Sequence, residues 1–245
     1  MNIKITKISS IIDGIRSMYM SKRSWNPELE QKLERWDSKF IDSTGGIIPH
    51  VSDPEFEDFN KTVKSLFKWG QKHITMLRFI DITCVVDGLH RGATDDFDAH
   101  AKRLENRIIR SSTRLANYGN EKSDWYKNKI LTTDEALEKL HIQIPEKIVD
   151  GENTYVKTVN GYVLEEYKNN RDVTRGLCML SIPMTFTFKI NVTELAHVYR
   201  ERGMREGGAN GSASPELQEM MELFIDELNK YIPNITREYL LGILN

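Results

Sequence analysis

The 245-residue sequence has little of what marks a secreted, membrane-spanning or disulfide-rich chain. It has two cysteines, Cys84 and Cys178, both in apolar runs, so we expect two buried thiols in a reducing compartment and no disulfide framework. Charged residues such as Asp81 and Lys189 interrupt the longest apolar stretches, so we expect no membrane-spanning segment. The first residues lack the continuous apolar run of a signal peptide. We therefore expect a cytoplasmic protein.

Neither sign of charge dominates, because 34 basic residues face 36 acidic ones and the formal net charge is −2. Such a chain does not attract nucleic acid through bulk charge, and we expect no nucleic-acid partner. Apolar residues make up 39% and charged residues 29%, which fits a folded globular chain. The length allows one large domain, and we see no internal repeat.

Motifs for metal and phosphate binding are also missing. The histidines lack zinc-type spacing, and the glycines near residue 208 are not followed by the Lys-Ser or Lys-Thr of a phosphate loop. Asp95, Asp96, Asp98 and His100 could supply metal ligands. Acidic residues at a helix start also stabilise the helix dipole, and we favour that explanation and expect no metal.

The hydrophobic pattern predicts a mixture of helices and strands, so the fold class is α+β or α/β. The predicted helices begin at Pro27, cover about 55–69, run from a Thr94 cap to at least Arg110, and cover 133–140, 191–203 and 215–231. The predicted strands lie in 2–12, where the strand leads into a short helix, in 76–86, and in 177–190 after a loop around Pro183, with a hairpin turning at Asn160-Gly161. Residues 116–170 are polar and broken by turns.

Arginines beside small polar residues are the most informative feature. Arg107, Arg110 and Arg114 are interleaved with serines and a threonine, and further arginines stand at 175, 200 and 202. Guanidinium groups bind phosphate through two parallel hydrogen bonds, so convergence of these segments would create an anion site. Exposed arginines at helix ends are the alternative, and spacing alone favours them.

Three segments resemble the flavin-dependent thymidylate synthases. The clearest is RGLCMLSIPMTFTFKINVTELAHVYRER from Arg175 to Arg202, where an arginine, an apolar strand, an asparagine and a helix ending in arginine follow in the family's order. His73-Ile-Thr75 is similar to the family's His-Glu-Thr-Pro segment, and Ser112-Thr113-Arg114 is similar to its Ser-Gly-Arg. The resemblance covers about residues 70–115 and 172–231.

The resemblance implies one domain over residues 1–245, with an antiparallel or mixed sheet flanked by long helices and a variable polar insertion at about 116–170. It implies FAD between subunits of a homotetramer, dUMP as substrate, and methylenetetrahydrofolate and NADPH as co-substrates. By the resemblance, Arg202 is the catalytic residue and also holds the pyrimidine. The remaining roles carried over are nucleotide binding by Ser112, Arg114 and Arg175, and FAD binding by Thr75, Arg107, Asn191 and His197.

The sequence also departs from the family. Its Arg-His-Arg is represented here by Glu105-Asn106-Arg107, and a carboxylate near the flavin pyrophosphate would weaken FAD binding. Two alternatives therefore stand beside a thymidylate synthase-like enzyme. One is a divergent relative acting on another pyrimidine nucleotide, and the other is a non-catalytic nucleotide- or partner-binding protein with the same fold.

Overall fold

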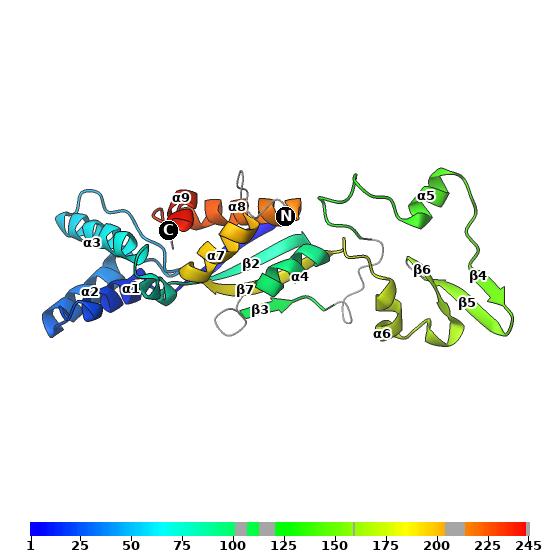
Figure 1. The fold of residues 1–245 in the computed structure, drawn as a ribbon, viewed down its shortest axis with the longest axis horizontal. Helices are drawn as coiled ribbons and strands as arrows, with labels where there is room; N and C mark the ends of the chain where they lie inside the picture. The colour runs from blue at the N-terminus through cyan, green and yellow to red at the C-terminus, as the bar shows by residue number, and fades with distance from the viewer. Residues whose placement is uncertain (101–106, 113–120, 159, 204–213, 244–245) are drawn as a thin grey trace.

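The computed structural model describes residues 1–100, 107–112, 121–158, 160–203 and 214–243. These residues form an elongated molecule with a helical end, a central sheet and an arm (Figure 1). We call residues 121–180 the arm and the other described residues the body. Arg114 and the Glu105-Asn106 pair lie outside the described residues, as do the side chains of His100, Arg107 and Arg175.

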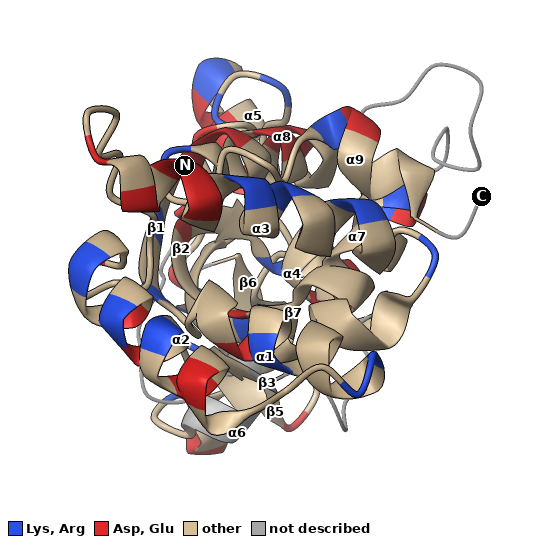
Figure 2. Ribbon diagram, turned by 90° about the vertical axis from the view of Figure 1, so that its left-hand side faces the viewer, with Lys and Arg blue, Asp and Glu red and all other residues tan. Residues whose placement is uncertain are grey.

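Three helices build the helical end: α1 (Ile11–Ser21), α2 (Pro27–Phe40) and α3 (Pro54–Gly70). The predictions for α2 and α3 are confirmed, since each begins with proline after a capping side chain, Asn26 for α2 and Asp53 for α3. Buried aromatic rings join them, with Phe59 5.5 Å from Trp36 and 5.2 Å from Phe40 between ring centroids. Basic and acidic residues intermix on the surface of this end (Figure 2), as a near-neutral chain predicts.

The central sheet has four antiparallel strands in the order β1 (Asn2–Ile8), β2 (Asp81–His90), β7 (Pro183–Asn191) and β3 (Arg107–Arg110). Cys84 pairs with Phe188 and Val86 with Phe186, and these side chains are buried on one face. That face is covered by α4 (Arg91–His100), α7 (Val192–Arg202) and α8 (Pro215–Asn229). The result is a mixed α+β fold with an antiparallel sheet, as predicted.

The opposite face of the sheet carries polar and exposed side chains. Thr185, Thr187 and Lys189 alternate with the buried residues of β7, as the two-residue period of a strand requires. Ile109 on the edge strand β3 is 76% exposed. Within the described residues this face is therefore not part of the hydrophobic core.

The arm contains short elements only (Figure 1). In chain order they are α5 (Thr133–Lys139), β4 (Lys147–Asp150), β5 (Asn153–Thr158), β6 (Gly161–Leu164), a 3-10 turn η2 (Glu165–Tyr167), α6 (Arg171–Thr174) and a 3-10 turn η3 (Arg175–Leu177). The predicted helix at 133–140 and the hairpin are confirmed, and Asn160 takes the positive φ of 71° that such turns demand. Much of the predicted polar insertion falls in this arm.

The predicted helix from Thr94 to Arg110 is wrong at both ends. It begins earlier, at Arg91, because the imidazole Nε2 of His90 accepts the Ala93 amide proton at 3.0 Å, the contact that a capping side chain makes. Arg107–Arg110 is a strand, because its backbone pairs with the free edge of β7. Tertiary pairing overrides the helical pattern there.

The strand predicted at 76–86 begins too early. Residues 74–79 form the 3-10 helix η1 (Ile74–Phe79), in which the consecutive residues Met76 and Leu77 are both buried, so β2 begins at Asp81. The strand predicted after a loop around Pro183 is confirmed, because β7 begins at Pro183 and the carbonyls of Leu180 and Ile182 before it accept the first free amide protons of α4.

Cys84 is buried, but Cys178 lies half-buried in the arm, so only one cysteine is a core thiol. A C-terminal helix, α9 (Arg237–Gly242), was not predicted and packs on α7. Among the described helices, none has the length and hydropathy required to cross a membrane.

Candidate functional site

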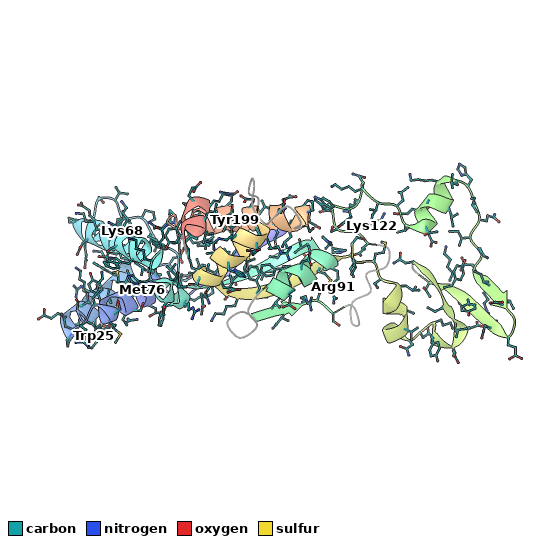
Figure 3. All side chains as sticks on the ribbon, viewed as in Figure 1. Trp25, Lys68, Met76, Arg91, Lys122 and Tyr199 are labelled. Atoms are coloured by element: carbon teal, nitrogen blue, oxygen red, sulfur yellow. The ribbon has the colours of Figure 1, made fainter. Side chains whose placement is uncertain are left out.

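A groove of about 500 Å³ lies at the helical end, where α1, α3 and η1 meet. We call it the helical-end groove; it is lined by Ser17, Ser21, Lys22, Trp69, His73, Thr75, Met76 and Phe79. Met76 in Figure 3 marks its position. The groove contains Thr75, one of the residues expected to bind FAD.

A column of three side chains forms one wall of this groove. The Trp69 and His73 rings stack with centroids 5.4 Å apart and planes inclined by 24°, and the Lys22 Nζ stands 4.7 Å from the Trp69 centroid. Phe79 adds an apolar surface that is 51% exposed. A planar aromatic ligand with a negative charge fits such a combination of rings and one cation.

Two more of the expected FAD residues lie at the same end of the sheet. The Thr193 hydroxyl donates to the Ile74 carbonyl at 2.9 Å, which ties the start of α7 to η1 beside Thr75. Asn191 precedes this threonine; it is buried, and its side-chain oxygen caps α7. The backbone of Arg107 pairs with Lys189, two residues before Asn191.

His197, the fourth expected FAD residue, is exposed on α7. It is not among the residues that line the helical-end groove. By backbone position, three of the four residues expected to bind FAD, namely Thr75, Asn191 and Arg107, therefore lie at the same end of the sheet.

A second hollow, of about 590 Å³, lies at the opposite end of the sheet where the arm joins the body. We call it the junction hollow; its lining residues are His90, Gly92, Asp95, Asp96, Tyr126, Ile130, Met179, Leu180 and Ser181. Arg91 stands between His90 and Gly92, which both line the hollow. Figure 3 shows Arg91 well separated from Met76, which lines the helical-end groove. Since β7 has nine residues at about 3.3 Å each, its two ends lie roughly 26 Å apart.

A buried histidine and glutamate fix the back of the junction hollow. His90 and Glu216 are 5% and 1% exposed, and the His90 Nδ1 is hydrogen-bonded to the Glu216 carboxylate. Because Nε2 accepts the amide proton of Ala93, the proton of the neutral imidazole sits on Nδ1, where it donates to Glu216. The pair thereby joins the end of β2 to the starts of α4 and α8.

Tyr126 brings the arm against this pair. Its ring meets the His90 ring edge-on, with centroids 4.8 Å apart. Burial, followed by the negative charge of Glu216, raises the pKa of the Tyr126 phenol, which therefore stays protonated at neutral pH and can donate a hydrogen bond.

Arginines and aspartates beside the hollow pair with one another. The Asp95 carboxylate accepts from the Arg91 Nε at 3.0 Å and also binds Arg110, whose other terminal nitrogen lies 3.5 Å from Asp98. These pairs occupy Arg110, one of the arginines considered for an anion site. They also account for two of the four suggested metal ligands, and no group suited to a metal occurs within the described residues.

The expected nucleotide-binding residues do not converge within one chain. Ser112 follows β3 at the hollow's end of the sheet, since the neighbouring Ser111 amide bonds to the Thr185 carbonyl at 2.8 Å. The backbone of Arg175 lies in η3 of the arm, and Arg202 ends α7 over the body (Figure 1). Arg202 is half-buried.

Sequence reasoning missed the residues that form the junction hollow. Glu216 follows proline in the first turn of a helix, a position where acidic residues are normally solvated, and Tyr126 stands in a polar stretch. The residues that follow Trp125 show neither the helical nor the strand period of apolar side chains. Only the meeting of three distant segments identifies these residues as neighbours.

No family model matches the chain, and no curated protein matches its sequence. Solved structures do match over nearly the whole chain. A flavin-dependent thymidylate synthase, ThyX, from Helicobacter pylori, complexed with FAD and dUMP, covers 100% of this chain and 98% of its own at a TM-score of 0.52 and 12% identity. A UMP/dUMP methylase, PolB, from Streptomyces cacaoi, bound with 5-Br dUMP, covers 98% of this chain and 93% of its own at a TM-score of 0.58 and 12% identity.

At these identities the likeness establishes the fold. The chain has the fold of the flavin-dependent thymidylate synthases, as the residue resemblance predicted.

Proposed function

We propose that the protein binds FAD and transfers a one-carbon group from methylenetetrahydrofolate to the 5-carbon of a pyrimidine nucleoside monophosphate, with reducing electrons from NADPH. The observation that carries this proposal is the placement of Thr75, Asn191 and the Arg107 backbone around one end of the sheet. The resemblance of the sequence assigns these same residues to one cofactor. The full-length fold similarity supports the same reading.

The helical-end groove fits the planar part of a flavin. The Lys22–Trp69–His73 column supplies an aromatic wall and a cation, and the serines of α1 and Thr75 supply hydroxyl groups. When bound, the flavin supplies the hydride chemistry, so the protein needs no nucleophile of its own. This suits a chain whose Cys84 thiol has its pKa raised to about 12 by burial.

Nucleotide binding is the role of the arginines and Ser112 in this proposal. We assign the phosphate to Arg175, with Ser112 and Arg114 as further donors, because guanidinium and hydroxyl groups match phosphate oxygens. Arg202 is assigned to the pyrimidine ring, where its guanidinium holds a carbonyl oxygen and stabilises charge that develops during attack.

A second copy of the chain is part of this proposal. Thr75 and Asn191 lie at one end of a sheet roughly 26 Å long and Ser112 lies towards the other end, too far apart for flavin and nucleotide to meet within one chain. A homo-oligomer, which the resemblance gives as a tetramer, can bring the groove of one copy to the nucleotide residues of another. The sheet face that no described element covers, and the exposed Ile109 on it, offer a surface for that contact.

FAD titration of two tryptophan variants tests the cofactor site. Trp69 and Trp25 are each 42% exposed, but only Trp69 lines the groove. We expect Trp69→Ala to weaken FAD binding about tenfold, a loss of about 1.4 kcal/mol, and Trp25→Ala to leave it unchanged. Equal FAD affinities for both variants, or wild-type protein that retains no flavin absorbance after incubation with excess FAD, would contradict the proposal.

Calorimetry tests the assignment of Arg175. Arg175→Ala should weaken nucleotide monophosphate binding about ten- to a hundredfold, and Arg175→Lys should restore part of it, since an ammonium group cannot make the planar paired contact. Unchanged affinity in both variants would remove Arg175 from the site.

A second candidate function is modification of a pyrimidine nucleotide other than dUMP. The similarity to PolB supports this candidate, because PolB is described as a UMP/dUMP methylase and UMP is a ribonucleotide. Comparing UMP with dUMP in the same calorimetric experiment separates the two candidates.

A further inference from the structure

The junction hollow holds a carboxylate that the proposed function leaves unused. Asp95 is engaged by Arg91 and Arg110, whereas Asp96, one residue later on α4, has no ion pair or hydrogen bond to any described residue. Asp96 is exposed to solvent and lines the hollow. Among the described residues it is thus a carboxyl group without a partner at the edge of the hollow, where it can accept hydrogen bonds.

The deeper wall of the hollow offers a second polar group without a partner. Ser181 is 6% exposed, and its hydroxyl finds no hydrogen-bond partner among the described residues. A buried hydroxyl without a partner is costly, and a ligand in the hollow could satisfy it. This observation is independent of the aspartates and points to an occupant.

The remaining lining suits a flat heterocycle. Ile130, Met179 and Leu180 supply apolar surface, and the protonated Tyr126 hydroxyl adds a donor. A volume of about 590 Å³ is within the range of small-molecule sites. The hollow also adjoins one expected phosphate ligand by backbone position, since its lining residue Asp95 binds Arg110, two residues before Ser112.

We infer that the junction hollow receives the pyrimidine ring and that Asp96 selects a ring with an amino group at position 4, so that the preferred nucleotide is a cytidine-type monophosphate. This inference rests on the proposed function. A carboxylate accepts hydrogen bonds from the exocyclic amino group of cytosine, whereas it faces the lone pairs of the carbonyl oxygen that uracil carries at the same position. An asparagine in its place can donate to that oxygen, so Asp96→Asn should shift preference towards uridine-type nucleotides.

Calorimetry on the full-length protein with excess FAD tests the inference, with dCMP and dUMP as probes. We expect wild-type protein to bind dCMP about ten- to a hundredfold more tightly than dUMP, the range that one correct base contact provides. In Asp96→Asn this ratio should fall at least tenfold. Asp98→Asn is the matched control, because it makes the same change on the same helix at a residue that does not line the hollow. Its ratio should equal that of the wild type.

The outcomes separate the inference from the proposed function. Equal or tighter binding of dUMP by the wild type, or a ratio that Asp96→Asn does not move, overturns the base assignment while nucleotide binding itself stands. Absence of binding by either nucleotide overturns both. Ser181→Ala gives a second measurement, since losing the hydroxyl should weaken dCMP in a variant whose thermal stability is not reduced; unchanged affinity would remove Ser181 from the site.

Discussion

The body and the arm are built from the same kinds of helix and strand, but they differ in what they bury. The core of the body collects apolar residues from the helical end, the sheet and the covering helices. No described residue of the arm belongs to that core, and Val163 is the arm's one buried apolar side chain among those described. Val149 and Leu140 in the arm are 72% and 67% exposed.

Polar contacts hold the arm instead. The buried Lys122 amine donates to the Ile130 carbonyl at 3.0 Å and pairs with Glu135 at 2.5 Å, while Thr132 and Glu135 complete a capping box at α5. Such contacts fix local conformation but each contributes little to global stability. A three-stranded sheet without a buried face is marginal alone, so the arm should open at a lower free energy than the body.

The largest expected effect comes from removing the same side chain in each region. Leu66→Ala in α3 should lower the free energy of unfolding by about 2–5 kcal/mol, because it leaves a cavity in a fully buried site. Leu140→Ala after α5 should change it by less than about 0.5 kcal/mol, since that leucine is already exposed. Chemical denaturation measures both. Similar losses would mean that the arm is packed against something that buries Leu140.

Next in size is the buried pair at the junction. Glu216→Ala should cost about 2–3 kcal/mol, because it leaves the Nδ1 proton of buried His90 without an acceptor. Glu219→Ala on the exposed side of α8 serves as the control and should cost less than about 0.5 kcal/mol. Thermal unfolding followed by circular dichroism compares them, and an equal shift in midpoint would show that the pair is dispensable.

Helix caps should give smaller and regionally different effects. Asn26→Ala removes the cap of α2 and should cost about 1 kcal/mol in global unfolding. Thr132→Ala breaks the capping box of α5, and its cost of about 1 kcal/mol should appear only as faster amide hydrogen exchange within the arm. A global destabilisation by Thr132→Ala would indicate that arm and body unfold together.

The smallest perturbation is chemical labelling of the two cysteines. Burial is the main cause that raises the pKa of Cys84 to about 12, so at pH 8 its thiol stays protonated and unreactive in the folded protein. Cys178, half-buried in the arm, should react first with a thiol reagent. In Cys178→Ala, labelling should require denaturant; rapid labelling without it would place the opening of the body's core at low free energy.

Residue patterns alone determined the elements whose signals are local. Proline and capping residues fixed the starts of α2, α3, α7 and α8, and two-residue alternation fixed the buried face of β7, because these features depend on neighbours along the chain. The resemblance of the Arg175–Arg202 run likewise led to the fold that the solved structures support.

Tertiary structure decided what depends on distant segments. Arg107–Arg110 became a strand because the edge of β7 was free, and α4 began at Arg91 because His90, held by Glu216, could cap it. The division of the expected site residues between two ends of the sheet was invisible in the sequence, since Thr75 and Ser112 are closer along the chain than Thr75 and Asn191. Sequence separation does not measure spatial separation once strands pair across the sheet, and that pairing is set by the packing of the whole core.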